Sequence, residues 1–297
     1  MADTIATPLD GAPTRPAKRR VRSRRGPLAY VLRAVVIVYL FFLVVWPVSV
    51  VVQRAFAPTD GKPGGIGPLW ERLTDPAAIY AFNLTLTVSF WAVVINTVFG
   101  VGISLLLVRH RFPGRRALSV LIDLPMSVSP VVIGLALVLT YSTSLGIFGD
   151  VLQATGLRII NSTPGLIMAT AFVSLPLVIR EVIPVLEEVG DDAEIAAKSL
   201  GANAWQAFWR ITLPTIKWAV VYGVVLSAAR AIGEYGAVRI VSRGAEFNGE
   251  TATLLIQNEY GAFNEAAAYA AAFVLVVMAV LALVVITVIR PQESHRS

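Results

Sequence analysis

The sequence contains no cysteine, and this absence excludes disulfide bonds and thiolate metal ligands. Its only two histidines are His110 and His295, so neither a histidine-based catalytic triad nor an HExxH zinc site is present. The phosphate-binding pattern GxxxxGK[ST] is also missing, because the sole Gly-Lys pair, Gly61-Lys62, is followed by Pro63. We therefore predict a chain that is not an enzyme, that holds no metal and no cofactor, and that does not hydrolyse ATP itself.

Charged residues are scarce as well. Only 15% of the 297 residues are charged, against about 25% in soluble globular domains, and 56% are apolar. The mean hydropathy is +0.70. These values predict an all-α integral membrane protein. Six segments are long enough to cross about 30 Å of hydrocarbon as helices: 28–52, 82–108, 117–141, 164–186, 213–235 and 266–289. Prolines interrupt the third and the fourth.

Basic residues are distributed unevenly around these segments. Seventeen of them fall on the side of the two termini and six on the opposite side. By the positive-inside rule, both termini are expected in the cytoplasm. The basic stretch 1–27 has too few large apolar residues to fold, so we predict a disordered tail there and a short cytoplasmic tail over 291–297. The net charge of +6 also suits nucleic acid, but a basic tail beside an apolar segment favours a membrane anchor and no nucleic acid.

The stretch 190–214, GDDAEIAAKSLGANAWQAFWRITLP, is a polar, amphipathic insert between two apolar segments. Asp191 followed by Glu194 predicts a capping box that starts a short helix. Gly201 suits the left-handed backbone that ends a helix. A second short helix is expected to carry three aromatic side chains on one face: Trp205, Phe208 and Trp209. We interpret the insert as a docking element in which two short helices meet at Gly201.

This insert resembles the cytoplasmic EAA loop of ABC importer permeases, which forms a coupling helix in a groove of a separate ATPase subunit. Six residues occupy positions of its motif: Ala196, Ala197, Gly201, Ile211, Leu213 and Pro214. The chain departs from the motif at Ile195, where the family has Glu, and Glu194 lies one position earlier. The resemblance implies these ATPase-coupling residues: Glu194, Ala196, Ala197, Gly201, Trp205, Phe208, Leu213 and Pro214. A helix lying on the bilayer surface is the alternative, although it does not require this spacing.

Ionisable residues lie within the fifth apolar segment. At about 100° per residue, four residues fall on one stripe of an otherwise apolar helix: Gly223, Ser227, Arg230 and Glu234. A charge at the centre of a membrane helix costs about 2.5–3.5 kcal/mol, so the stripe is expected to face protein or water as part of a translocation path. The i, i+4 spacing permits an ion pair, and a purely structural pair stays open. Arg230 is the better functional candidate, because a guanidinium binds oxyanions through bidentate hydrogen bonds.

Two serines of the third segment, Ser127 and Ser129, lie between Pro125 and Pro130. Prolines free backbone groups, which is tolerated in a membrane only against protein or a cavity. The serines are therefore further candidates for the translocation path. A packing kink with the serines bonded to local carbonyls is the other interpretation. Asn96 in the second segment is expected to join helices rather than to bind a ligand.

The stretch ARAIGEYGAV at 229–238 resembles the corresponding part of sulfate and molybdate permeases. Three further stretches make the chain most similar to the CysW-type subunits of sulfate/thiosulfate importers: KWA at 217–219, YGVVL at 222–226 and GET at 249–251. The resemblance implies the type I ABC importer permease (MetI-like) fold, as a six-helix transmembrane domain over 28–290 in the cell inner membrane. It also implies a second homologous permease subunit, two ATPase subunits and an extracytoplasmic oxyanion-binding protein as partners.

Three other functions fit less well. A molybdate or tungstate permease shares the fold and the charge pattern. A secondary anion transporter would show inverted repeats with paired broken helices and would not need the docking loop. An intramembrane enzyme would need a nucleophile and a base or a set of metal ligands, which the sequence lacks. We therefore expect a permease subunit that forms half of a translocation path and couples to a separate ATPase.

Overall fold

The computed structural model describes residues 27–58 and 63–289. Within these ranges every regular element is a helix, which confirms the all-α prediction. The chain forms two compact units that divide between Pro47 and Val48. The tails predicted over 1–27 and 291–297 lie outside the described residues, apart from Pro27.

The first predicted segment is helical from Pro27 to Ala55. It consists of α1 (Pro27–Leu40), a π-helical turn η1 (Phe41–Val45) and α2 (Trp46–Ala55). The Trp46 N–H donates to the Phe41 carbonyl, which is the i to i−5 spacing of a π-helix. The stretch Ala29–Ala55 is long and apolar enough to cross a membrane.

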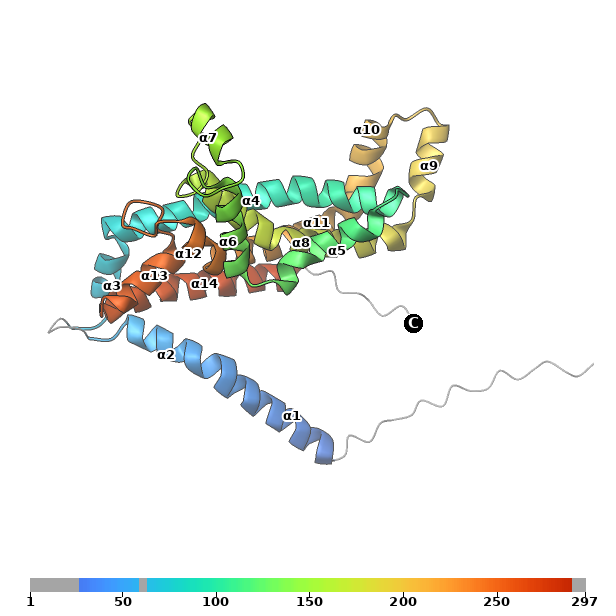
Figure 1. The fold of residues 1–297 in the computed structure, drawn as a ribbon. Helices are drawn as coiled ribbons and strands as arrows, with labels where there is room; N and C mark the ends of the chain where they lie inside the picture. Colours follow the sequence, from blue (N-terminus) through green and yellow to red (C-terminus); the bar gives the residue numbers. More distant parts are fainter. Residues whose placement is uncertain (1–26, 59–62, 290–297) are drawn as a thin grey trace, which may run out of the picture. The chain divides into compact units, whose positions relative to one another are not determined.

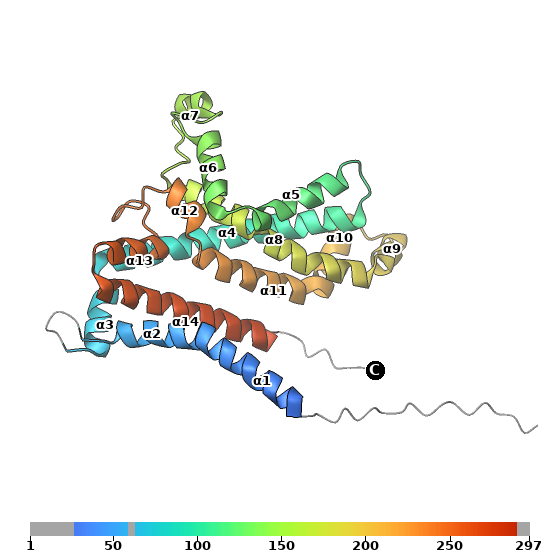
Figure 2. The same cartoon turned by 60° about the horizontal axis from the view of Figure 1, so that its bottom comes forward.

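The remaining helices belong to the second unit (Figure 1). They are α3 (Ile66–Leu73), α4 (Pro76–Arg109), α5 (Arg115–Ser127), α6 (Pro130–Tyr141), α7 (Gly149–Thr155), α8 (Thr163–Val189), α9 (Asp192–Ser199), α10 (Ala204–Ala207), η2 (Phe208–Thr212), α11 (Leu213–Ile232), α12 (Gly236–Val241), α13 (Ala252–Gly261) and α14 (Glu265–Ile289). Figures 1 and 2 both show α4 running along this unit, with α9 and α10 at one end and α3 and α13 at the other.

Helix α4 is the longest element. The Asp75 carboxylate caps its start by accepting from the Ala77 N–H at 2.9 Å, and Pro76 occupies the first turn, where its missing N–H costs nothing. Its 34 residues extend over about 50 Å, well beyond the hydrocarbon thickness of a bilayer. One helix can therefore contact both ends of the unit.

The third predicted segment is not one straight helix. It divides into α5 and α6, which are bent by 115° relative to each other. Val128 and Ser129 leave the helix, with ψ angles of 141° and 135°, and Pro130 favours this at Ser129 because its ring disfavours helical backbone at the residue before it. The third segment is thus interrupted by proline, as the sequence predicted, and the break lies at Pro130. Five helices of the described chain can cross a membrane, or six if the bent pair is one span.

The helix of the fifth predicted segment, 213–235, begins and ends at other residues than predicted. It begins at Ala204, nine residues before the predicted start, and runs through α10, η2 and α11 to Ile232. The chain then leaves the helix and begins α12 at Gly236. Glu234 therefore lies between two helices and not on α11, which corrects the prediction of one helical stripe that includes it.

Helices α4, α8 and α11 pack side by side (Figure 2). Gly100 and Gly223 permit the close approach: a β-carbon at Gly100 would lie 2.9 Å from Val178 Cγ1, and one at Gly223 would lie 3.0 Å from Val178 Cα. The buried Asn96 amide of α4 donates to the hydroxyls of Ser174 (2.8 Å) and Ser227 (3.3 Å) on the other two helices. Asn96 thus joins three helices, as predicted.

Candidate functional site

The insert at 190–214 folds as one short helix, α9, and the first turns of the long helix that begins with α10, and both lie at one end of the unit (Figure 1). Between them, Gly201 adopts a φ of +90°, which a residue with a side chain rarely accepts. The N–H groups of Gly201 and Ala202 donate to the carbonyls of Lys198 and Ala197, each at 3.0 Å, and satisfy the end of α9. The predicted left-handed turn at Gly201 is confirmed.

The predicted capping box at the start of α9 is wrong. Asp191 occupies the cap position, but its side chain makes no capping hydrogen bond. A capping box instead starts α10, where Asn203 Oδ1 accepts from the Gln206 N–H at 2.8 Å and Gln206 Oε1 accepts from the Asn203 N–H at 3.0 Å. Glu194 turns away from its own helix end, because an arginine from α4 binds it.

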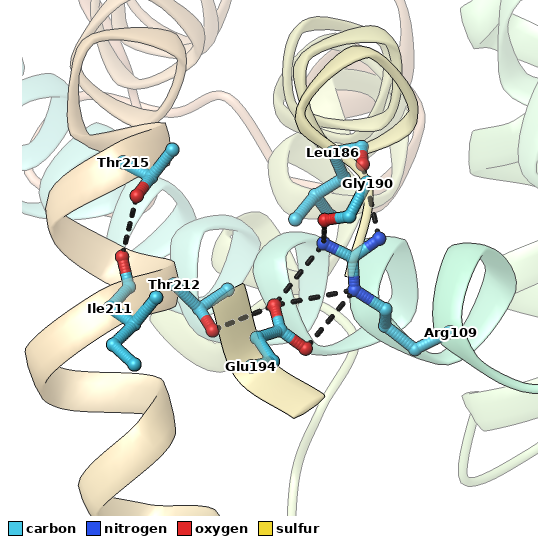
Figure 3. Close-up of polar contacts among 7 residues, drawn as sticks. All are labelled: Arg109, Leu186, Gly190, Glu194, Ile211, Thr212 and Thr215. Carbon is cyan, nitrogen blue, oxygen red and sulfur yellow. Dashed lines mark hydrogen bonds and ion pairs between the residues drawn. The ribbon is translucent and has the colours of Figure 1, made fainter. Parts of the chain in front are cut away.

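That arginine is Arg109, the last residue of α4 (Figure 3). Its Nε lies 3.3 and 3.2 Å from the two carboxylate oxygens of Glu194, and its Nη2 lies 3.2 Å from Oε1. The same guanidinium donates to the carbonyls of Leu186 (3.1 Å) and Gly190 (2.7 Å). The Thr212 hydroxyl donates to Glu194 Oε1 at 2.9 Å. One side chain therefore ties α4, the end of α8 and α9 together.

Sequence reasoning assigned Arg109 only to the basic residues that set orientation. Arg109 and Glu194 are 85 positions apart, and no local pattern relates them. Their side chains are 13% and 15% exposed, so the pair is largely shielded from water. Shielding from water strengthens the attraction between two opposite charges. The carboxylate predicted to face the ATPase is thus engaged inside the permease.

The loop exposes several large apolar and aromatic side chains among its polar and charged ones. Trp205 is 69% exposed and Leu200 is 89% exposed, and Ile195 and Trp209 are about half exposed. The rings of Trp205 and Trp209 pack edge to face, with centroids 5.4 Å apart. Exposed aromatic clusters of this kind mark contact sites for other proteins.

The other predicted coupling residues lie in two environments. Ala196 and Pro214 are exposed, and Ala197 is half-buried. Phe208 and Leu213 pack against the core cluster formed by α4, α8 and α11. The loop therefore has an outer surface and an inner, anchoring surface, and Trp205 belongs to the outer one.

A second candidate site surrounds Arg230, near the end of α11. Its Nη1 lies 2.6 Å from Oε2 of Glu234, so the predicted ion pair is formed. The Glu234 side chain is 2% exposed and its Oε1 accepts from the Ala237 N–H at 2.9 Å, at the start of α12. Arg230 keeps 37% of its side chain exposed. The carboxylate is therefore fixed by the backbone, while the Arg230 side chain stays partly exposed.

Two helix breaks meet beside this pair. A β-carbon at Gly236 would lie 3.0 Å from Cβ of Pro130, the residue at the bend between α5 and α6. A β-carbon at Gly134 would lie 2.8 Å from Cβ of Ile240 on α12. The start of α12 and the start of α6 are thus packed against each other. Irregular backbone at membrane depth is tolerated where it is buried in protein or lines a water-filled space.

The profile of the family described as "Binding-protein-dependent transport system inner membrane component" matches residues 96–294. The chain belongs to this family. It is 39% identical over 277 residues to the sulfate transport system permease protein CysW of Synechococcus elongatus, covering 93% of this chain and 94% of that one. It is 41% identical over 244 residues to the CysW of Escherichia coli K12, covering 82% and 81%. The CysT permease of the same strain is 37% identical over 227 residues, covering 76% and 82%.

Solved structures give the same fold. A bacterial ABC transporter that imports the polysaccharide alginate superposes with a TM-score of 0.71 over 88% of this chain and 93% of that one, at 19% identity. The same kind of transporter in complex with an alginate-bound periplasmic protein gives a TM-score of 0.70, at 20% identity. The predicted permease fold is confirmed.

In this member of the family, the other predicted path residues lie in different environments. Gly223 packs against α8 and Ser227 is fully buried against Asn96, so both contact neighbouring helices of the same chain. Ser127 is exposed and its hydroxyl donates to the Asp123 carbonyl at 3.4 Å, which is the local bond of the packing-kink interpretation. Ser129 is exposed at the start of α6, where its side chain makes no cap.

At the opposite end from the docking loop, α4 contacts the connection between α12 and α13. The Gly249 N–H donates to the Tyr80 hydroxyl at 3.2 Å, and the Ala252 N–H donates to Thr85 Oγ1 at 2.8 Å. Glu250, in the stretch GET that the sequence singled out, is buried. These contacts hold the connection on the first turns of α4.

Glu250 lines a cavity of about 490 Å³ and accepts from Asn258 Nδ2 at 2.6 Å. Burial raises the pKa of Glu250 above its ordinary value of 4.5, and the negative charges of Glu246 and Glu259 raise it further, while the Asn258 hydrogen bond opposes the shift. The folded chain holds this proton more tightly than the unfolded chain. The contribution of Glu250 to stability therefore falls as the pH rises above 4.5.

Proposed function

We propose that the chain is the permease subunit of an ATP-driven importer of sulfate and thiosulfate. The similarity to sulfate permeases over nearly the full length of both chains carries this proposal: the CysW of Synechocystis is 41% identical over 266 residues, covering 90% of this chain and 94% of that one. The chemistry of the site agrees, since a partly exposed guanidinium suits a tetrahedral oxyanion.

The assembly follows from the same relatives. CysW and CysT are both permeases that resemble this chain, so its partner would be a second homologous permease, and the two would enclose the path between them. Two ATPase subunits would bind the docking loops of the pair, and this chain itself would carry out no catalysis. An extracytoplasmic binding protein would deliver the anion, as the periplasmic protein in the alginate transporter complex suggests. We expect the six apolar segments, within 28–290, to form the membrane domain.

Arg230 would provide part of the positive potential along the path. A dianion that leaves water needs compensation for its lost hydration, but a full unpaired charge would trap it. Glu234 offsets the guanidinium at 2.6 Å, and the Arg230 side chain remains 37% exposed. Partial neutralisation would let the anion bind and then leave.

Uptake of radiolabelled sulfate in a host that lacks its own sulfate permeases tests the substrate. We expect uptake only when this chain is produced together with a second permease, the ATPase and the binding protein, and we expect thiosulfate to compete. If the complex takes up molybdate but not sulfate, the chain is a molybdate permease subunit instead. Uptake by this chain alone, without an ATPase, would contradict an ABC importer.

We also propose that the docking loop and both termini face the cytoplasm. The bias in basic residues supports this orientation. Because the chain has no native cysteine, single cysteines can be introduced and labelled selectively. Asn248→Cys should react with an impermeant thiol reagent in intact cells, and Ser199→Cys should react only after the cells are opened. Both positions are exposed, so labelling of Ser199→Cys from outside would reverse the orientation.

A further inference from the structure

The α9 helix is attached to the permease mainly through polar contacts. It has eight residues and none of them is fully buried, so apolar burial contributes little to its attachment. Its connection to α8 is Gly190, which adopts a φ of +69° and has no atom within 4 Å of the position of a β-carbon. A glycine with space around it is a flexible joint. Without a further contact, α9 would move independently of α8.

Arg109 supplies that further contact. Its guanidinium donates to the Leu186 and Gly190 carbonyls on one side of the joint and to the Glu194 carboxylate on the other. A guanidinium offers five N–H donors in a rigid planar fork, and an ammonium group cannot reach these acceptors in the same geometry. The Thr212 hydroxyl binds the same carboxylate from η2. Glu194 is thus held from two elements at once.

Arg109 is also one end of a continuous helix. Asn96 joins α4 to α8 and α11 at a position thirteen residues, or about 20 Å, along the helix. Tyr80 and Thr85 join its far end to the connection before α13. Because α4 is continuous, a shift of its Arg109 end would also move the hydrogen-bonded residues in its middle and at its other end.

We propose that Arg109 is a positioning residue for coupling, which makes α9 move as one body with the adjoining ends of α4 and α8. Motion of an ATPase bound to the loop is then passed to the transmembrane helices and is not absorbed at Gly190. This inference rests on the proposed function. It gives Glu194 an internal role, because its carboxylate is 15% exposed and faces Arg109 and Thr212, not the outside of the loop.

The test uses the reconstituted complex with its second permease, ATPase and binding protein. Arg109→Gln should still assemble and hydrolyse ATP, but the sulfate transported per ATP should fall by about tenfold, within the usual range of coupling between sites. Arg109→Lys should lose less, since it keeps the charge, and Glu194→Gln should lose least, since its amide oxygen still accepts from Arg109 and Thr212. Arg111→Gln is the matched control, because it removes an exposed charge two residues away.

A distance measurement separates positioning from a general loss of activity. Spin labels at Ser199→Cys on α9 and Val98→Cys on α4 should give a narrow distance distribution in the parent chain and a broad one with Arg109→Gln. Both label sites are exposed. If Arg109→Gln does not reach the membrane, Arg109→Lys is measured in the same way and decides the question.

The outcomes are distinguishable. If the parent complex and Arg111→Gln transport sulfate while the Arg109 variants match them in transport per ATP and in distance width, the positioning role is refuted and the proposed function stands. If the parent complex itself shows no ATP-dependent sulfate transport, the proposed function fails. A broad distance with normal coupling would also refute the role, because motion would then pass without the Arg109 contacts.

Discussion

Truncation of Trp205 to alanine is expected to weaken binding of the ATPase to the permease pair by about thirtyfold or more, because buried aromatic anchors contribute about 2 kcal/mol or more at interfaces. The ring is 69% exposed in this chain, so its loss removes no core contact and the permease should stay folded. The affinity of the purified ATPase for the permease pair in detergent measures the effect. Trp70→Ala is the matched control, since Trp70 is 67% exposed on α3, at the other end of the unit.

Phe208 makes a less clean test. It packs against the core cluster of α4, α8 and α11, so Phe208→Ala would combine a loss of stability with a loss of binding. A comparison of Trp205→Ala with Trp70→Ala avoids this ambiguity. Equal ATPase affinity for these two variants would show that the exposed aromatic face is not the docking surface.

Gly201→Val tests the same loop through its backbone. No atom lies within 4 Å of a β-carbon at this position, so the substitution causes no clash. It does force a φ of +90° on a β-branched residue, at a cost of about 1–2 kcal/mol or more. The turn between α9 and α10 should then open. Transport should fall while the amount of permease in the membrane is unchanged, and a normal transport rate would contradict the need for this turn.

The sequence predicts the apolar helices well because each one satisfies its backbone within itself. Prolines show where this reasoning weakens. Pro176 and Pro184 lie inside an unbroken α8, whereas Pro130 separates α5 from α6 by a bend of 115°. The difference depends on whether the residue before the proline can leave the helix and pack elsewhere. Here the start of α6 packs on α12, a contact that no local pattern specifies.

For the polar residues too, local spacing predicts less than contacts with distant helices decide. The spacing of Asp191 and Glu194 matches a capping box, but the capping box in the structure is formed by Asn203 and Gln206. The Glu194 carboxylate is bound by Arg109 instead. The local capping interaction is replaced by an ion pair with a residue of a distant helix, which no local spacing could predict. In the fifth segment, Gly223 and Ser227 are buried against neighbouring helices of the same chain. Periodicity did not reveal that Ser227 faces Asn96 while Arg230 stays half exposed.

Replacement of Arg230 by glutamine is expected to lower sulfate uptake by about tenfold to a hundredfold, the loss that follows when a hydrogen-bonded charge is removed from an anion. The binding protein should still bind its anion, because it is a separate chain. Arg158→Gln, at an exposed position before α8, is the matched control for loss of one positive charge. Uptake and the amount of permease in the membrane are measured together, so that a folding defect is not mistaken for a transport defect.

The double variant Arg230→Gln/Glu234→Gln decides between the two roles of this pair. In a purely structural ion pair, Arg230→Gln fails because it leaves the carboxylate of Glu234 buried without its cation, and the second substitution removes that penalty. The amide oxygen that Glu234→Gln introduces can still accept from the Ala237 N–H, so α12 keeps its cap. Uptake by the double variant should then return to the control level. We expect the opposite: membrane abundance recovers and uptake stays low, because the sulfate ion still lacks the guanidinium that compensates its dehydration. Full uptake would remove Arg230 from the path and leave it as a contact between α11 and the start of α12.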